Sequence, residues 1–201
     1  MTFNLKKEIL IFFTIFFLIG IFVYLFLNGG AYVRILRYNL SLQQVTLAES
    51  DIKNKSYYLY IPKIEVSAPI ILPENNSSES VLSSLEKGVE LYPGSKLPGQ
   101  TGQSVILGHS SRVSWYSGKY AYVFSLLNKL QHEDEFYIII GNNKLVYKIF
   151  ADDILTPEQT NDLILRTPKN ESTVVLITCW PIGFSSKRVV IQAKLDRIEK
   201  I

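Results

Sequence analysis

The chain has 201 residues, of which 47% are hydrophobic, and it carries one cysteine and a net charge of +3. Of the 21 basic and 18 acidic residues, four basic and one acidic lie before Tyr38, which leaves 17 of each in the rest of the chain. A neutral body without a Lys/Arg run lacks the electrostatic footprint of a nucleic-acid-binding protein. A single cysteine excludes an intrachain disulfide.

Residues 9–27 read ILIFFTIFFLIGIFVYLFL, without a charged side chain. Nineteen helical residues span about 28 Å, close to the thickness of the hydrocarbon core of a bilayer. The run therefore predicts a transmembrane anchor after a tail of residues 1–8. A cleaved signal peptide is the alternative, but its apolar region is shorter, and Gly29-Gly30-Ala31 matches a small-x-small cleavage site poorly. The short N-terminal tail favours a single-pass protein of the cell membrane with its body outside the cytoplasm, although basic residues flank both ends of the run.

Residues 28–56 are expected to form a juxtamembrane linker, into which the membrane helix continues or a second short helix follows. From residue 57 the pattern changes to short apolar runs separated by Pro, Gly and Asn, which is typical of β-strands. The predicted strands cover residues 57–64, 68–72, 103–108, 135–140, 144–151, 173–178 and 189–195. Short helices are expected over 77–87 and 122–130, and residues 156–170 are expected to be mostly loop with one helical turn near 161–165. We therefore predict a mainly β fold for residues 57–201, a closed barrel of about seven to eight strands with two or more short helices.

Three residues at the ends of apolar strands could carry chemistry. Cys179 ends the run 174–178, His109 follows 105–108, and Arg188 opens the last strand. Taken singly, each has an ordinary interpretation: a small buried cysteine, a hydrogen-bonded histidine at a sheet edge and a surface arginine. Adjacent barrel strands would bring these ends to one rim, where an imidazole and a guanidinium activate a thiol and stabilise an oxyanion. The other histidine, His132, lies in a polar run and is expected to be solvated.

These residues also carry a resemblance to a known family. The run Leu176-Ile177-Thr178-Cys179 resembles the T-L-x-T-C signature of sortases, and Arg188 follows Cys179 by nine positions. Ile61-Pro62-Lys63-Ile64 is similar to the first strand of the sortase barrel, and residues 88–109 are similar to the run that leads to the family's histidine. The pair Trp180-Pro181 resembles the class D/E branch. Two positions depart from the family's pattern. Val175 replaces the first Thr of the signature, and Ser110 follows the histidine where many members carry Arg.

The resemblance implies a sortase-type barrel and a membrane-anchored cysteine transpeptidase. Such an enzyme cleaves a C-terminal LPXTG-like sorting signal through a thioester and transfers the acyl group to an amine, which attaches proteins to the cell wall or builds pili. The resemblance assigns Cys179 as nucleophile, His109 as acid and base, and Arg188 as the group that stabilises the oxyanion. Trp180 and Thr178 are candidates for substrate contact, but Thr178 should point to the opposite strand face, where packing is its favoured role.

The expected partners are proteins that carry sorting signals, an amine acceptor such as a peptidoglycan precursor or a pilin lysine, and the membrane. No cofactor or metal site is expected, and a need for calcium is left open. Two other functions stay open: a hydrolytic cysteine peptidase, and a membrane-anchored β-barrel binding module with an incidental cysteine. In the binding module, substitution of Cys179 would leave the function intact.

Overall fold

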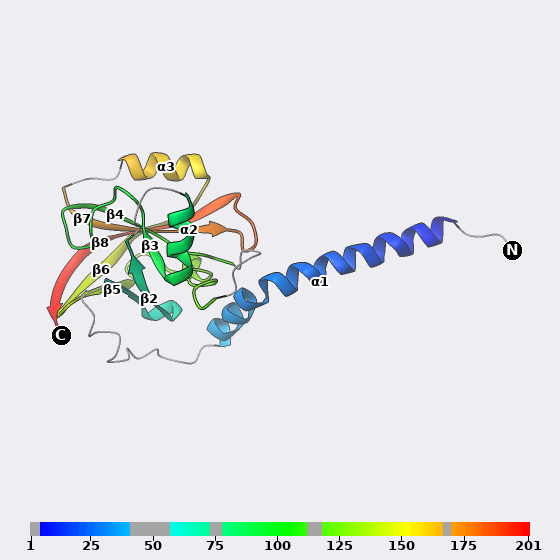
Figure 1. Ribbon diagram of the computed structural model, residues 1–201, viewed down its shortest axis with the longest axis horizontal. Helices are drawn as coiled ribbons and strands as arrows, with labels where there is room; N and C mark the ends of the chain where they lie inside the picture. Colours follow the sequence, from blue (N-terminus) through cyan, green and yellow to red (C-terminus); the bar gives the residue numbers. More distant parts are fainter. Residues whose placement is uncertain (1–4, 41–56, 73–77, 112–117, 167–169) are drawn as a thin grey trace.

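The computed structural model describes residues 5–40, 57–72, 78–111, 118–166 and 170–201, and its body is a closed β-barrel (Figure 1). Within these residues the strands follow one another around the barrel in the order β1-β2-β3-β4-β7-β8-β6-β5, and β5 pairs back to β1. Neighbouring strands are antiparallel except for the parallel pairs β2–β3 and β4–β7. The predicted mainly β barrel is therefore confirmed.

The strands are β1 (Tyr58–Ile61), β2 (Val66–Ile71), β3 (Val89–Leu91), β4 (Gly102–Leu107), β5 (Glu135–Ile140), β6 (Asn143–Leu155), β7 (Ser172–Trp180) and β8 (Lys187–Lys200). The α-helices are α1 (Leu5–Leu40), α2 (Ser78–Lys87) and α3 (Pro157–Arg166), and two short 3₁₀ turns are η2 (Pro62–Ile64) and η3 (Leu127–Lys129).

Side chains alternate between the two faces of each barrel strand, as the strand period of two requires. On β7, for example, Val174 and Leu176 belong to the core inside the barrel, whereas Val175 and Ile177 belong to a second cluster outside it. The inner core is closed by large aromatic side chains such as Phe124 and Phe136, both fully buried. The wall between β4 and β7 is therefore apolar on both faces.

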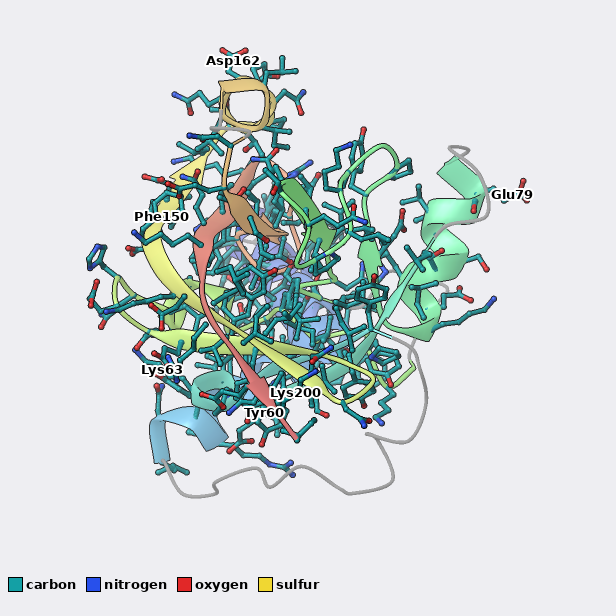
Figure 2. All side chains as sticks on the ribbon, turned by 90° about the vertical axis from the view of Figure 1, so that its left-hand side faces the viewer. Tyr60, Lys63, Glu79, Phe150, Asp162 and Lys200 are labelled. Carbon is teal, nitrogen blue, oxygen red and sulfur yellow. The ribbon has the colours of Figure 1, made fainter. Side chains whose placement is uncertain are left out.

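Helix α3 covers the outer cluster, with Leu163 and Ile164 packed against it (Figure 1). Asp162 points the other way, into solvent (Figure 2). The helix begins with a capping box: the Gln159 backbone N–H donates to Thr156 Oγ1 at 3.3 Å, and the Thr156 N–H donates to Gln159 Oε1 at 2.9 Å. The expectation of mostly loop over residues 156–170 was therefore wrong, because this cap and the apolar face stabilise a ten-residue helix.

Other elements differ from the prediction in extent. The predicted helix over 122–130 is a series of turns that ends in η3, and the predicted strand over 57–64 divides into β1 and η2. Strand β3 was not predicted, because three residues are too few to show alternation. Strands β6 and β8 run several residues further than predicted, and each extension pairs with the apolar part of the other strand.

Helix α1 is a single helix of 36 residues. It is long and apolar enough to cross a membrane, and its most apolar window is wholly exposed, projecting away from the barrel (Figure 1). Residues 28–40 continue the same helix and lie against the barrel, where Ala31 is fully buried and Ile35 and Tyr38 pack on the core. The rest of the expected linker, residues 41–56, lies outside the described residues.

Candidate active site

Cys179 and Arg188 face each other across the antiparallel pair β7–β8. Alternation places both on the outer face of the barrel, because their neighbours Thr178 and Val189 are buried inside. Directly opposed residues of an antiparallel pair have Cβ atoms about 4.5–5.5 Å apart. The thiol and the guanidinium therefore share one small area of the outer surface, and both side chains are partly exposed.

The parallel pair β4–β7 brings His109 to the same area. Leu107 is registered with Ile177, and the pairing continues one residue further, since the Gly108 N–H donates to the Ile177 carbonyl oxygen at 3.2 Å. The next residue, His109, therefore leaves β4 next to the end of β7 that carries Cys179. Its carbonyl oxygen accepts the Phe124 N–H at 2.8 Å, which fixes the chain where it leaves the strand.

A glycine makes this arrangement possible. A Cβ atom on Gly108 would lie 2.4 Å from the nearest atom of the Phe124 ring, so a side chain at this position would displace either the ring or the strand end. The Thr178 hydroxyl donates to the Gly108 carbonyl oxygen at 2.7 Å. Thr178 thus lies on the inner face and joins the ends of the two strands that carry His109 and Cys179.

The electrostatics of the three groups differ. Burial lowers the pKa of His109, and the negative charge of Glu86 on α2 acts in the opposite direction. The imidazole is therefore mainly neutral near pH 7. Arg188 is held by its own loop: its Nη1 donates to the carbonyl oxygens of Ser185 at 2.7 Å and Lys187 at 2.9 Å. A neutral imidazole beside a thiol can accept its proton, and a fixed guanidinium can stabilise a developing oxyanion.

A pocket of about 550 Å³ runs from Arg188 along the outer face of the barrel. Its floor is apolar, with Val105 and Leu107 from β4 and Ile177 from β7. Helix α3 forms one wall with Ile164 and other residues, and Tyr92 lines the pocket after β3. An apolar cleft that ends at a cation, close to a thiol, suits an extended peptide with a bulky apolar side chain.

Trp180, the other candidate for substrate contact, is half-buried and packs against the inner core. The walls of the pocket were not predicted from the sequence, because α3 was expected to be loop. The signal that was overlooked is the capping box of Thr156 and Gln159 before Leu163 and Ile164. Among the described residues, no group of three or more His, Cys, Asp or Glu side chains is placed to hold a metal ion.

Comparison with known proteins identifies the family. The model of the sortase domain matches residues 59–196. Sortase D of Bacillus subtilis (strain 168) is 30% identical over 139 residues, which is 68% of this chain and 61% of that protein, so the match spans less than two thirds of the relative.

Solved structures agree. Sortase A from Corynebacterium diphtheriae has a TM-score of 0.58 at 26% identity, over 73% of this chain and 63% of the other. Sortase C-1 from Actinomyces oris has the same TM-score and identity, over 84% of this chain and 98% of the other. With the domain match over most of the barrel, these findings lead to one conclusion: the chain belongs to the sortase family.

Proposed function

We propose that this chain is a membrane-anchored transpeptidase that cleaves a C-terminal LPXTG-like sorting signal and transfers the acyl group to an amine. The observation that supports the proposal is the register of three strands. The pairing of β7 with β8 sets Cys179 opposite Arg188, which lines the apolar pocket, and the pairing of β4 with β7 brings the strand end before His109 next to the end of β7. Members of the sortase family are cysteine transpeptidases, and Cys179 is the only cysteine of the chain.

In the first half of the reaction, His109 takes the proton of the Cys179 thiol, and the thiolate attacks the carbonyl carbon of the scissile peptide bond. Arg188 donates to the oxyanion of the tetrahedral intermediate. The C–N bond then breaks, the imidazolium of His109 gives its proton to the leaving amine, and a thioester remains on Cys179.

In the second half, an amine attacks the thioester while His109 removes its proton. The C–S bond breaks, the new amide leaves, and the imidazolium of His109 returns the proton to the Cys179 thiolate. The acceptor is proposed to be an amine of the cell envelope, such as a peptidoglycan precursor or a pilin lysine. Water in place of the amine would give hydrolysis, so access of water to the thioester decides between the two outcomes.

The pocket under α3 is the proposed seat of the apolar residues of the sorting signal. It runs along β4 and β7 to Arg188, which lies opposite Cys179, and its volume of about 550 Å³ accommodates bulky apolar side chains. Thr178 is proposed to position the strand ends from inside the barrel, through its hydrogen bond to Gly108. Trp180, half-buried next to the thiol, is proposed to contact substrate with its exposed edge.

The remaining features complete the proposal. Helix α1 is proposed to cross the cell membrane with the barrel outside the cytoplasm, since its apolar run has the length of a bilayer core. The pair Trp180-Pro181 and the likeness to sortase D support a place in the class D/E branch. No cofactor takes part in the proposed steps.

The test uses the full chain in detergent micelles, incubated with a library of L-P-x-T-G-like peptides and a small amine. Intact-protein mass should show an acyl adduct on Cys179, and peptide masses should show the amine-capped product. Cys179→Ala should abolish both, and His109→Ala and Arg188→Ala should reduce turnover by about 10²-fold or more.

His132→Ala is the matched control for His109, because its imidazole is exposed, and it should retain wild-type turnover. An adduct that yields only hydrolysed peptide would favour the cysteine peptidase. A folded protein that forms no adduct with any member of the library would overturn the proposal in favour of a binding module.

A further inference from the structure

A second cavity, of about 420 Å³, lies between residues 30–37 of α1 and the barrel, and it shares no lining residue with the pocket under α3. Arg34 and Arg37, about one helical turn apart, line it from α1, and Lys119 lines it from the segment before β5. Glu65, which follows η2, is the one acidic residue in its lining. Figure 2 shows the end of α1 beside the turn that carries Lys63 and leads to this residue.

The positive charges of this cavity are not neutralised by ion pairs among the described residues. Among the described residues, Arg34 donates to the backbone carbonyl oxygens of Tyr122 at 2.8 Å, Ile64 at 3.1 Å and Glu65 at 2.9 Å, and the Glu65 carboxylate also acts on it electrostatically. Lys119 Nζ lies 5.3 Å from the centroid of the Tyr120 ring, which is not charged. Three cations around one partly enclosed space, with a single carboxylate, create a positive potential that attracts an anion.

The position of the cavity along α1 identifies the kind of anion. The apolar run ends at Leu27, and Arg34 follows it by seven residues, or about 10 Å along the helix. Side chains on a helix lean towards its N-terminus, so Arg34 and Arg37 lean back towards the end of the run. The polar headgroup region extends about 5–7 Å beyond each side of the hydrocarbon core, within reach of such side chains.

Two tyrosines of α1, Tyr24 and Tyr32, flank the end of the apolar run. The Tyr24 and Tyr32 hydroxyls lie 2.9 Å apart on α1, and the Tyr24 hydroxyl donates to the Ile182 carbonyl oxygen at 2.9 Å. Tyrosine is enriched where a membrane-spanning helix meets the headgroups. Tyr32 lies between Gly30 and Arg34, which both line the cavity, so the cavity lies just beyond the end of the apolar run.

We propose that this cavity binds the phosphate of an anionic membrane phospholipid, with Arg37 and Lys119 as its direct contacts and Arg34 as the fixed positive charge behind them. The inference rests on the proposed membrane anchoring of α1 but not on the proposed chemistry of Cys179. A phosphate of a soluble molecule would have the same charge, but the headgroup depth of the cavity favours the lipid.

The experiment uses the full chain in nanodiscs of phosphatidylcholine with a minority of phosphatidylglycerol. After transfer to detergent, native mass spectrometry counts the lipids that stay bound. The wild type should retain phosphatidylglycerol in preference to phosphatidylcholine, and the double variant Arg37→Gln/Lys119→Gln should retain about tenfold less of it. Lys87→Gln/Lys194→Gln, which removes two exposed cations elsewhere, is the matched control and should behave as the wild type.

Three outcomes would overturn the proposal: no preference for phosphatidylglycerol, equal retention by the Arg37/Lys119 variant, or an equal loss in the control. A separate arm adds inorganic phosphate to the protein in detergent. If phosphate alone raises the melting temperature of the wild type and not of the Arg37/Lys119 variant, while phosphatidylglycerol has no effect, the ligand is a soluble phosphate and not a lipid.

Acyl-adduct formation on Cys179 is measured on the same nanodisc samples. Selective lipid retention without adduct would refute the proposed reaction and leave the lipid site standing. Adduct formation without selective lipid retention would refute the lipid site and leave the proposed reaction standing. A protein that alkaline carbonate releases from membranes would remove the premise of a membrane anchor and with it the lipid site.

Discussion

At the scale of single residues, the environment of His109 sets its resting charge. The imidazole is partly buried at the end of β4, and burial disfavours its charged form more than the carboxylate of Glu86 favours it. A neutral imidazole is the form that can accept the proton of Cys179. In the proposed reaction His109 acts as a base before the first proton transfer and as an acid after it, and a neutral resting imidazole fits this order.

The pKa of His109 can be measured directly, because the chain has only one other histidine, His132. In the full chain with His132→Gln, we expect the imidazole signal of His109 to titrate below the ordinary value of 6.5. Glu86→Gln should lower this pKa further, because the carboxylate stabilises the imidazolium. NMR with labelled histidine follows both titrations, and a midpoint at or above 6.5 would contradict the assignment.

Glu90 is a second titratable residue with an unusual environment. It lies on β3, opposite Leu107, fully buried, and neither carboxyl oxygen has a hydrogen-bond partner among the described residues. Burial raises its pKa from 4.5 to about 7. Between these two values the folded protein holds the proton and the unfolded chain does not, so stability falls as the pH rises through this window.

Glu90→Gln removes the charge and keeps the shape of the side chain. We expect it to stabilise the protein by about 1–2 kcal/mol at pH 8 and to have little effect near pH 4.5, where Glu90 itself is protonated. Melting temperatures of the two proteins at both pH values measure the difference. An equal gain at both values, or a loss at pH 8, would show that charge is not the cause.

At the scale of elements, the site depends on where three strands end. The apolar runs before His109 and Cys179 and after Arg188 are visible in the sequence, so these residues could be chosen as candidates. Which strands lie next to one another could not be predicted from the sequence, because β4 and β7 are parallel and are separated in the chain by β5, β6 and α3. The pairing is decided by packing on both faces of the wall, which a linear pattern does not record.

Helix α3 shows the opposite case, in which a local signal was present. Thr156, Pro157 and Gln159 have the order of a capping box with proline at the first helical position. The segment is otherwise polar, and its short apolar face becomes stabilising only against the outer cluster of β4, β7 and β8. The capping box therefore predicts the helix, but the position of the helix as a pocket wall also depends on the outer surface of the barrel.

The strand end at Gly108 provides a test of this geometry. In Gly108→Ala the new methyl group would meet the Phe124 ring, so we expect a loss of about 1–3 kcal/mol in stability and a larger loss in adduct formation as His109 moves. Gly29→Ala is the control, because nothing lies within 4 Å of its Cβ position. Thermal melts and adduct yields measure the two effects. Unchanged values for both in Gly108→Ala would contradict the tight packing.

At the scale of the whole molecule, α1 belongs to two environments. Its first half is exposed and apolar, whereas Gly30, Ala31 and Arg34 are held against the barrel. Tyr24 also contacts the loop between β7 and β8, through its hydrogen bond to Ile182 and its ring against Phe184. This loop joins Cys179 to Arg188, so the helix supports the loop next to the proposed catalytic residues.

Two truncations separate these roles. Removal of residues 1–22 should leave the melting temperature of the body nearly unchanged, because none of the barrel contacts described above lies in that part. Removal of residues 1–40 should destabilise it by about 2–4 kcal/mol, since it exposes the surface under Ala31 and deletes the three hydrogen bonds of Arg34. Equal melting temperatures of the two truncated proteins would show that residues 23–40 of α1 do not stabilise the barrel.

The parallel pairing of β4 with β7 also has a consequence for the order of folding. The two strands are joined by a loop that contains β5, β6 and α3, so their contact is of high sequence separation and costs considerable loop-closure entropy. His109 and Cys179 meet only when this loop has closed. A partly folded chain therefore lacks the arrangement of His109, Cys179 and Arg188 on which the proposed reaction depends.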